Sequence, residues 1–560
     1  MNYKITILLA FLITPIVNGQ SWLSSNIITG SDDITIIKSA EGPNNSNLVM
    51  GYFIGTIQTS NGIILTSNGG RDYFVAKFDE VNTIEWIHQF GSAGNVFVEG
   101  GIAVDLNGDI HITGGFKNDD LYYTASEFIE NTGGFDIFYA KMDPTGTVIW
   151  CNNIGSGLSN QRPASLTYDN NGHVLISGFF SDSIKFHEDL TLYDDDVIAN
   201  YFFSKFDIVT GNLIWAKQIK GLNNALSGQI FNVVNSNNSY TFVGMYAGTV
   251  EFESTETLIS SSSLYDIHIF NTDLDGIVNW IRSIKGTGDE YIYAITSDPA
   301  NAIYVSGYYS SDNLTLDIND SETMTIEGNS GGYDFFMAKY SQDGTFQWIK
   351  TNGGESTDKI YSIDYFDEEI HVTGLFSDTL YWGGIELATN GTGDQDMFYG
   401  SLDLNGNYRS ANSFGGRNNS VEEGRAIFND SEGLSTVISS NSDLLILGDS
   451  MYINPAKTYI VAVGTIGCFP ISYDNITETD ITSCFGDETG YISMGVSGGF
   501  GGPFEYSIDN GNTYQYNNPN FSNLPAGTYN LTVKDAKNCV EAGPEVVLTQ
   551  PTQIAITEVD

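Results

Sequence analysis

The amino-acid sequence predicts an all-β protein, in which a closed seven-bladed β-propeller precedes a small immunoglobulin-like β-sandwich. Three observations predict it. A phrase built around one tryptophan recurs every 60 to 68 residues from Trp22 onward, and such a period is typical of repeat architectures. The chain holds 61 Gly, 32 Tyr and 33 Phe, a composition typical of short strands joined by tight turns. The two ends of the repeat region carry complementary halves of one unit.

The first 19 residues resemble a signal peptide. Lys4 precedes the mostly apolar stretch 5–13, and Val17-Asn18-Gly19 forms a small-residue cleavage site. The alternative is a buried N-terminal helix. The apolar run is too short to span a bilayer, and no later segment reaches about 18 apolar residues. We therefore expect export, a secreted or cell-surface location, and no direct membrane insertion.

The net charge of −47, from 69 acidic and 22 basic residues, limits the partners of the chain. Such a surface repels phosphate backbones, so we expect no nucleic-acid partner. An extracellular surface, a glycan or a protein ligand remains, and divalent ions are compatible with the charge. The simplest interpretation of the charge is solubility outside the cell.

The repeat contains an aromatic strand that starts at an aspartate and a tryptophan strand that follows it. In three clear copies Asp72, Asp136 and Asp334 each precede a tryptophan by 14 residues, and weaker copies start at Asn200, Asp266 and Asp396. We interpret these aspartates and tryptophans as structural residues that define the blades. The tryptophans are Trp22, Trp86, Trp150, Trp215, Trp280 and Trp348, with Tyr408 in the seventh place.

A second phrase, an alternating strand that ends in glycine, completes each unit. It reads Ile110–Gly114, Val174–Gly178, Ile303–Gly307 and Ile370–Gly374, often after an Asx-Gly turn. Such turns need positive φ and predict hairpins. A more variable strand pair follows each glycine strand, so a unit accommodates four strands and an inserted hairpin.

The ends of the repeat predict how the propeller closes. The first unit begins at the tryptophan strand of Trp22, and the last aromatic strand, 458–463, has no tryptophan strand after it. We expect Tyr459–Val463 to pair with the strand at Trp22 and so to remove the exposed sheet edges. The alternative, an open solenoid, would need polar capping units.

Residues 22–465 resemble the bacterial β-propeller repeat called SBBP. The resemblance lies in Gly-Gly-aromatic-Asp-x-Phe-x-Ala-Lys, as at Gly331–Lys339, then a turn and Trp, then the glycine strand. It implies a propeller in an exported protein, and it implies no single activity. We assign residues 20–465 to this domain.

A different all-β pattern follows a linker predicted at 466–480. Alternating strands with regular turns over 481–552 predict a small sandwich of the immunoglobulin type. Cys484 and Cys539 lie near its two ends, so we predict a structural disulfide between them. The segment 507–514 resembles an Asp-box hairpin, which is a folding element.

Residues 476–551 resemble the SprB repeat of surface adhesins in gliding Bacteroidetes. The resemblance rests on the order Cys484, Gly498-Gly499, Pro503-x-x-Tyr-Ser, Leu524-Pro-Ala-Gly-Thr-Tyr, Val533-x-Asp and Cys539. Modules of that family occur in tandem, and Ile476–Asp480 returns 80 residues later as Ile556–Asp560. We expect 553–560 to be the start of a truncated further repeat. The resemblance implies adhesion or gliding motility.

The candidate chemical groups mostly recur with the repeat. His111 and His371 hold the same repeat position, His173 lies close to it, and His268 lies inside the aromatic phrase, so we expect structural roles; His88 and His187 have no motif. The recurring aspartates Asp72, Asp136, Asp266, Asp334 and Asp396 are expected to cap their own turns, and the alternative is a ring of carboxylates that lines the channel or binds cations.

No catalytic residue and no cofactor is predicted from the sequence. Asp105–Asp109 resembles half a calcium loop but lacks its remaining ligands, so a hairpin turn is the better interpretation and the metal requirement stays unknown. No paired CxxC spacing, G-x-S-x-G, HExxH or phosphate-binding loop occurs. Cys151 and Cys468 either pair with each other or both stay free.

Two hypotheses for the function follow. The first is an exported, non-catalytic binding or adhesion protein. The alternative is a secreted propeller polysaccharide lyase or glycosidase with a C-terminal tethering module. Propellers host such sites on one face, so the enzyme predicts irregular, non-repeating polar residues at one mouth of the channel.

Overall fold

The computed structural model describes residues 22–554, apart from short gaps. The gaps are 44–45, 80–82, 156, 158–159, 188–189, 194–199, 236–238, 253–256, 328–330, 367, 390–393, 416–420, 431–432, 441–443, 448–449, 454–458, 467–470, 499–502 and 536–538. For 22–27, 98, 187, 223–235, 426, 498 and the strands of 428–466 except Thr436, the backbone alone is described. The predicted signal peptide, Cys468 and residues 555–560 lie outside the described residues.

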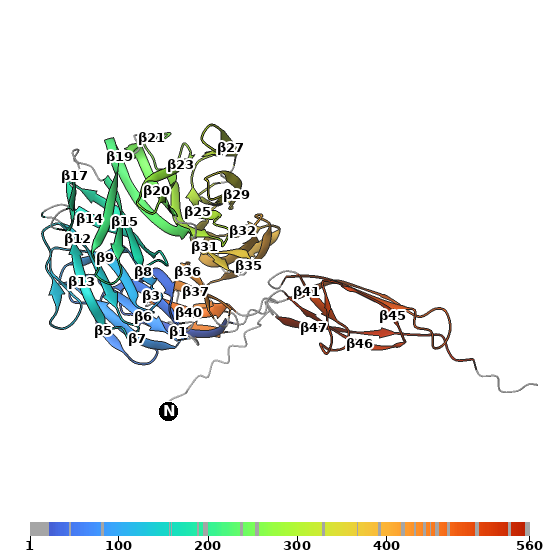
Figure 1. Cartoon of the computed structure of the whole chain (residues 1–560). Coiled ribbons are helices and arrows are strands. Elements are labelled where there is room, and N and C mark those ends of the chain that lie inside the picture. The colour runs from blue at the N-terminus through green and yellow to red at the C-terminus, as the bar shows by residue number, and fades with distance from the viewer. Residues whose placement is uncertain are drawn as a thin grey trace, which may run out of the picture. The chain divides into compact units, whose positions relative to one another are not determined.

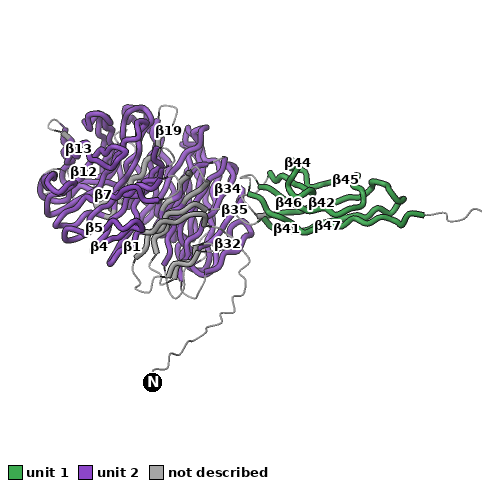
Figure 2. The backbone as a smooth tube through the Cα atoms, turned by 90° about the horizontal axis from the view of Figure 1, so that it is seen from below, with its two compact units in different colours: residues 1–21, 448–450, 467–560 green, residues 22–447, 451–466 purple. Residues whose placement is uncertain are grey.

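The chain folds into two compact units, 22–447 with 451–466, and 467–560 with two short segments (Figure 2). The larger unit is a seven-bladed β-propeller whose strands follow one another around a ring (Figure 1). Each blade is a four-stranded antiparallel sheet whose strands we number 1 to 4 from the channel outward. The first blade consists of β2 (Ile34–Glu41), β3 (Asn47–Phe53), β6 (Asp72–Phe78) and β7 (Ile84–Phe90).

Blades 2 to 4 continue the same order, and one long strand serves two of them. The N-terminal part of β19 (Leu213–Asn235) pairs with β18 as the outer strand of blade 3, and its C-terminal part pairs with β20 as the inner strand of blade 4. The other strands are β8 (Asn95–Val104), β9 (Ile110–Lys117), β12 (Phe135–Met142) and β13 (Val148–Ile154) in blade 2; β14 (Asn160–Tyr168), β15 (His173–Ser181) and β18 (Asn200–Asp207) in blade 3; and β20 (Ser239–Glu251), β22 (Asp266–Asp273) and β23 (Val278–Lys285) in blade 4.

Blades 5 to 7 complete the ring, and the last one closes it. They consist of β24 (Glu290–Ser297), β25 (Ile303–Tyr309), β28 (Asp334–Tyr340) and β29 (Phe346–Asn352); β30 (Lys359–Phe366), β31 (Glu369–Ser377), β34 (Gln395–Asp403) and β35 (Tyr408–Phe414); and β36 (Glu422–Asp430), β37 (Gly433–Ser440), β40 (Tyr459–Ile466) and β1 (Trp22–Gly30).

The predicted closure is confirmed. Strand β1 pairs antiparallel with β40, and the register joins Gly30 to Tyr459 and Asn26 to Val463. The N-terminal strand is therefore the outermost strand of a blade whose other three strands come from the C-terminal end of the ring, as Figure 1 shows at β1 and β40. Each tryptophan of the repeat, and Tyr408, lies on strand 4 of its blade, so the count to seven is confirmed as well.

An extra hairpin between strands 2 and 3 accounts for the long repeat. Strand β4 (Thr56–Thr59) of the first such hairpin pairs with β1 of blade 7, and β26 (Asn313–Asp317) pairs with β23 of blade 4. These hairpins thus join a blade to the outer strand of the blade before it. The remaining hairpin strands are β5 (Ile64–Thr66), β10 (Leu121–Tyr122), β11 (Phe128–Ile129), β16 (Ser183–His187), β17 (Leu190–Tyr193), β21 (Thr257–Ile259), β27 (Thr323–Glu327), β32 (Thr379–Trp382), β33 (Ile385–Ala388), β38 (Leu444–Leu447) and β39 (Ser450–Ile453).

Repeated tryptophans form hydrogen bonds between neighbouring blades. The indole nitrogen of Trp280 donates to the carbonyl of Gln342 in the next blade at 3.0 Å, and Gly344 of the same turn has φ +78. A Cβ added to Gly344 would lie 2.6 Å from the Trp280 ring. Indoles Trp86, Trp215 and Trp348 make the same bond to the blade that follows. Glycine is therefore required in this turn both for its positive φ and for the ring above it.

The smaller unit is a β-sandwich of two sheets, with orders β41-β42-β45 and β44-β43-β46-β47. Ile492, Phe521, Leu531, Val533 and Val546 belong to its core. Its strands are β41 (Ile471–Thr479), β42 (Gly490–Gly498), β43 (Glu505–Ser507), β44 (Gln515–Tyr516), β45 (Asn520–Leu524), β46 (Gly527–Lys534) and β47 (Val540–Leu548).

Two sequence predictions for this unit were wrong. The predicted linker 466–480 contains strand β41, which pairs with β42 along its length, so the module begins before residue 481. The predicted Cys484–Cys539 disulfide does not form: Cys484 is a free, exposed thiol, and Cys539 is disulfide-bonded.

The sandwich geometry explains why Cys484 and Cys539 stay apart. Ile481 and Gly486 bond to Thr549 and Gln550 after the end of β47, whereas Cys539 precedes its start. Nine residues of strand separate these ends by about 30 Å, and a disulfide needs Cα atoms within about 7 Å. Residues near the two ends of a module are close in space only when its strand order brings its first and last turns together.

Within the described ranges, no helix is long and apolar enough to cross a bilayer.

Candidate functional site

The propeller presents two ends with different chemistry. The turns that join strands 1–2 and 3–4 of the blades form one end, which we call the hairpin face; the turn 105–109 of blade 2 is an example. At the opposite end strand 1 begins, strand 2 ends and strand 3 begins, and we call this end the channel mouth. Antiparallel pairing places these three strand ends at the same level in every blade.

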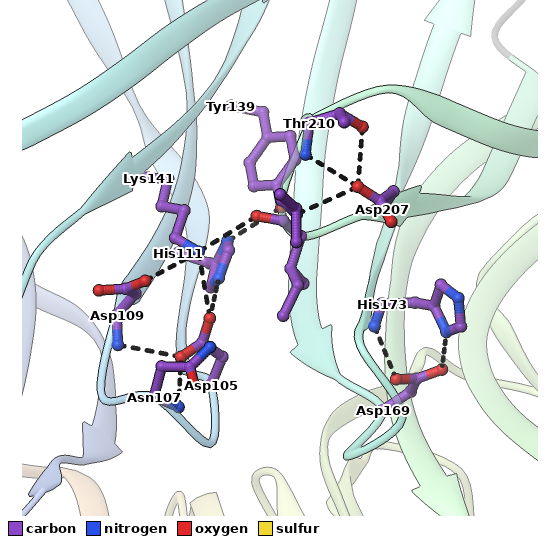
Figure 3. Close-up of polar contacts among 12 residues, drawn as sticks. Asp105, Asn107, Asp109, His111, Tyr139, Lys141, Asp169, His173, Asp207 and Thr210 are labelled. Carbon is purple, nitrogen blue, oxygen red and sulfur yellow. Dashed lines mark hydrogen bonds and ion pairs between the residues drawn. The ribbon is translucent and has the colours of Figure 1, made fainter.

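On the hairpin face a group of titratable side chains surrounds the buried carboxylate of Asp105 (Figure 3). The backbone N–H groups of Asn107 and Asp109 donate to one oxygen at 2.8 and 3.0 Å. The other oxygen lies 3.3 Å from His111 Nε2 and 3.2 Å from Lys141 Nζ. Gly108, at φ +83, allows the turn. The residues resembling half a calcium loop thus form a hairpin turn, as predicted.

The charges of this cluster are fixed by its contacts. Burial works to raise the pKa of Asp105, but His111, the two amides and Lys141 outweigh it and hold that pKa well below its usual range. Burial lowers the pKa of His111, whose Nδ1 lies 3.0 Å from the Tyr139 hydroxyl. Burial also opposes the charge of Lys141, but Asp109 and Asp105 raise its pKa. The cluster is an Asp⁻–Lys⁺ pair beside a neutral histidine.

The same device recurs in other blades, which favours a structural role. In blade 3, Asp169 accepts from the His173 backbone and ring at 2.9 Å each, and from the Tyr240 hydroxyl of blade 4 at 2.9 Å. In blade 5, Asp298 accepts from the Ala302 amide and the Tyr304 hydroxyl. In each of these blades, one oxygen of the aspartate carboxylate accepts hydrogen bonds from the backbone of its turn, and the other accepts one from a buried side chain. The expectation that His111 and His173 are structural agrees with these contacts.

The predicted capping role of the blade-defining aspartates is confirmed for those whose bonds are described. Asp72 is buried and accepts from the amides of Asn68 and Ser92 at 2.8 and 3.0 Å. Asp136 accepts from Thr132, and Asp266 from Ser261 and Gly286. Burial raises the pKa of Asp72 and of Asp136. Asp334 and Asp396 are buried at the same blade position, so the recurring aspartates do not line the channel.

His88, His268, His371 and Cys151 do not form a reactive group either, and the side chain of His187 lies outside the described residues. His371 Nδ1 lies 2.8 Å from the Tyr399 hydroxyl, and His88 Nε2 lies 2.8 Å from the Tyr123 carbonyl. His268 is buried among aromatic rings, which lowers its pKa to about 3. Cys151 is a free thiol whose pKa is raised by burial. Among the described residues, no three His, Cys, Asp or Glu side chains are placed to hold a metal ion.

The channel itself contains a cavity of about 580 Å³ lined by the inner strands of blades 1, 2, 3, 5, 6 and 7. Its interior carries Lys38, whose pKa burial lowers to about 8, and Asp364, whose pKa burial raises to about 7. Tyr293, Tyr361 and Arg425 line the part of the cavity next to the channel mouth. Aromatic and cationic side chains therefore line the mouth end of this cavity.

On one side of the mouth, an arginine lies among phenylalanine rings, and we call this group the Phe–Arg cluster. The Arg162 guanidinium lies 4.2, 5.0 and 5.5 Å from the ring centroids of Phe97, Phe135 and Phe179. Lys117 Nζ lies 3.9 Å from the Phe135 centroid. Among the described residues, no ion pair includes Arg162 or Lys117, and Arg162 Nε is buried without a hydrogen-bond partner.

Blades 5 to 7 carry a second group, which we call the Tyr cluster. The rings of Tyr291, Tyr293 and Tyr333 all lie within 5.4 Å of Tyr308, centroid to centroid. Lys359 Nζ lies 4.4 Å from the Tyr308 ring and 5.1 Å from the Tyr333 ring.

The Tyr cluster continues into blade 7 through Tyr361. Its ring centroid lies 5.4 Å from that of Tyr293, Arg425 lies 4.7 Å above it, and its hydroxyl donates to Glu423 at 3.4 Å. Arg425 and Glu423 form an ion pair. Burial raises the pKa of Tyr361 and lowers that of Lys359. These groups give the mouth both aromatic and charged side chains, among which Glu423 is paired with Arg425 and Glu99 also lines the cavity.

The mouth residues occupy positions that the repeat does not fix. Strand 1 carries one residue that pairs with the residue just after the repeat glycine of strand 2, or just after Ile438 in blade 7, and its chemistry changes from blade to blade. In blades 1, 3, 5, 6 and 7 this residue is Thr35, Arg162, Tyr291, Lys359 and Glu423. Sequence reasoning missed the mouth because it followed the recurring residues. The missing signal was a repeat position, next to constant ones, where the residue type changes.

The comparisons with known proteins give distant likenesses. No family model matches the chain. An uncharacterized WD repeat-containing protein of Acanthamoeba polyphaga mimivirus is 22% identical over 233 residues, which are 37% of this chain and 16% of that protein.

Solved structures of several kinds resemble the chain. A polysaccharide lyase described as a PL25 ulvan lyase is 9% identical, with a TM-score of 0.41 over 78% of this chain and 95% of its own. The Dos1 propeller is 8% identical, with a TM-score of 0.37 over 79% and 95%. A protein of unknown function from Dyadobacter fermentans is 9% identical, with a TM-score of 0.35 over 70% and 98%. The chain is a β-propeller followed by a β-sandwich, and these comparisons assign it to no family.

Proposed function

We propose that this chain is an exported, non-catalytic binding protein that attaches to an extracellular surface or ligand through the channel mouth of its propeller. The observation that carries the proposal is the contrast between the two ends of the ring. The hairpin face uses its acids, histidines and lysines to satisfy one another, blade after blade. The mouth instead presents half-buried aromatic and cationic groups at positions that vary among the blades.

The adhesin-like sandwich supports the same proposal. A module of this kind after the propeller suits a protein that is displayed or anchored while its propeller contacts a partner. Adhesion, and a link to gliding motility, is the biological role that we propose on the resemblance of residues 476–551. Propeller folds host many unrelated functions, so the residues of the mouth and the sequence of the module carry the proposal, and the fold does not.

Deletion of the gene and complementation test this proposal. Cells that lack the chain should adhere to and spread on surfaces less than the parent, and the unchanged chain should restore both. A chain with Arg162→Gln and Lys359→Gln should be exported and folded but fail to restore adhesion, whereas the control Arg409→Gln, on the hairpin face beside Asp403, should restore it. Unaltered adhesion after deletion would contradict the proposal.

A secreted polysaccharide lyase or glycosidase is the second candidate, and one specific observation favours it. The enzyme hypothesis drawn from the sequence predicts irregular, non-repeating polar residues at one mouth of the channel. Tyr361, Glu423 and Arg425 meet that expectation. A tyrosine beside a carboxylate and an arginine offers a proton-transfer group and a cation for a substrate carboxylate. Incubation of the purified chain with uronate and neutral polysaccharides distinguishes the two candidates. New reducing ends that appear with the unchanged chain and are lost in Tyr361→Phe would establish the enzyme.

A further inference from the structure

We propose that the channel mouth recognises an anionic polysaccharide, one that carries carboxylate or sulfate groups on its sugar rings. This inference rests on the proposed binding function and names the class of its ligand. It begins from the distribution of positive charge. The chain has only 22 basic residues and a net charge of −47. Five of those basic residues, Arg71, Lys117, Arg162, Lys359 and Arg425, lie at this one end of the ring, together with the carboxylates of Asp33, Glu99 and Glu423.

The cations of the mouth are held in position but incompletely neutralised. Arg71 lies 5.0 Å above the Tyr52 ring and only 3.8 Å from Asp33, at the edge of ion-pair distance. Arg162, Lys117 and Lys359 form no ion pair with any described residue. Aromatic rings therefore stabilise these charges in place of carboxylates. Such an arrangement leaves the guanidinium and ammonium donors available for an anion, which guanidinium groups bind in bidentate geometry.

The rings of the mouth supply the second half of the recognition. The half-buried rings of Tyr291 and Tyr333 form one platform, with the buried Tyr308 packed beneath them, and Phe97 and Phe135, whose ring centroids lie 4.0 Å apart, form another. A sugar ring presents an apolar C–H face that packs on such rings, while tyrosine hydroxyls bond its polar edge. Because one platform belongs to blade 2 and the other to blade 5, they lie on different sides of one channel opening. A ligand that contacts both must carry its charges and sugar faces at several points along a chain.

The same features disfavour other polyanions. Nucleic acid requires a broad basic surface that follows its backbone, and the chain as a whole carries a net charge of −47. An acidic peptide would satisfy the cations but has few groups that stack on the aromatic platforms. A polysaccharide with charged rings satisfies both the rings and the cations at once. Acidic peptides and nucleic acid therefore serve as the comparison ligands of the test.

Calorimetric titration of the full chain tests the ligand class. The ligands are oligogalacturonate, a sulfated galactan oligosaccharide, a neutral β-glucan oligosaccharide, poly-glutamate and single-stranded DNA. We expect one or both anionic oligosaccharides to bind, more weakly as salt rises, and the other three to bind at least tenfold more weakly. Arg162→Gln and Lys359→Gln should each weaken binding roughly tenfold to a hundredfold, which is the effect of one charge-assisted bond.

Two control variants and a cleavage assay separate the outcomes. Arg409→Gln on the hairpin face and Lys185→Gln on the inserted strand β16 should bind like the unchanged chain. Preferred binding of poly-glutamate, DNA or the neutral glucan at the mouth would overturn the anionic-polysaccharide proposal and leave the binding function intact. Tight binding that neither mouth variant weakens would overturn it as well. Cleavage of the bound oligosaccharide would overturn the non-catalytic function and leave the ligand class intact.

Discussion

The two ends of the propeller show how one repeat can carry both stability and recognition. At the hairpin face Asp105, His111 and Lys141 resemble an acid–base centre, yet each has a partner and equivalents recur in blades 3 and 5. At the channel mouth Arg162 and Lys359 contact rings instead of carboxylates, and their equivalents differ from blade to blade. The density of titratable groups is therefore a poor guide to function in a repeat protein, and departure from the repeat is a better one.

The largest effect is expected at the hairpin face, on stability. Asp105→Ala leaves the buried His111 without its carboxylate and Lys141 with the Asp109 carboxylate alone, so we expect a loss of about 3 kcal/mol in the free energy of unfolding. Urea denaturation measures it. Asp143→Ala is the matched control, because Asp143 caps an exposed turn through Thr145 and Thr147 without a buried partner, and should cost only about 1 kcal/mol. Equal losses for the two variants would contradict the buried-pair account.

The next effect concerns the contact between blades. Gly344→Ala puts a methyl group against Trp280 at a positive φ, so we expect a loss of about 2 kcal/mol or more. Gly172→Ala is the control, since Gly172 also has a positive φ, +91, but nothing lies within 4 Å of an added Cβ. Its loss should be about 1 kcal/mol. If the two variants unfold at the same urea concentration, the tryptophan does not hold the turn as described.

A smaller, pH-dependent effect comes from a buried acid just below the mouth. Burial raises the pKa of Glu290 to about 9, with Asp266 adding to the shift. A carboxyl whose folded pKa is raised holds its proton longer in the folded state, so its presence destabilises the protein progressively as pH rises from about 4 toward 9.

The variant Glu290→Gln should remove that dependence. Gln161 occupies the same register position in blade 3, where it pairs opposite Phe180, so the amide is compatible with the fold. We expect a gain of about 1 kcal/mol or more at pH 8 and little change at pH 4, measured by urea denaturation at both pH values. A variant that is less stable at pH 8 would show that the carboxylate is favoured there.

The smallest stability effect is expected at the mouth. Arg162→Gln removes contacts between a cation and three rings, and partly exposed contacts of this kind contribute about 0.5–1 kcal/mol. We therefore expect a stability change below about 1 kcal/mol, while ligand binding falls far more. A loss as large as that of Asp105→Ala would mean that the Phe–Arg cluster is a structural element of the ring.

Most of the ring could be predicted from the sequence because each blade repeats the same turns and aromatic residues. The closure between 459–463 and the first strand followed from two incomplete units, and the pairing of Gly30 with Tyr459 confirms it. The sandwich was harder. A single module has no internal copy that reveals where its first strand begins, so β41 was assigned to a linker. The strand order that separates Cys484 from Cys539 likewise leaves no local signal.

The mouth could not be assembled from the sequence for a different reason. Arg162, Phe97, Phe135 and Phe179 come from four strands in two blades, and their approach depends on the register and curvature of the ring. The constant positions of the repeat were visible, and they proved to be the positions that stabilise the fold. The variable positions beside them need the structure to show that they share one end of the channel.

Hydrogen–deuterium exchange of the full chain, with and without a sulfated galactan oligosaccharide or oligogalacturonate, tests the central claim most directly. The account predicts slower exchange around Tyr291, Tyr308 and Arg162 when the oligosaccharide is added, and unchanged exchange in the turns 105–109 and 169–173. Protection confined to those turns, with the mouth unaffected, would contradict the claim that recognition belongs to the channel mouth and stability to the hairpin face.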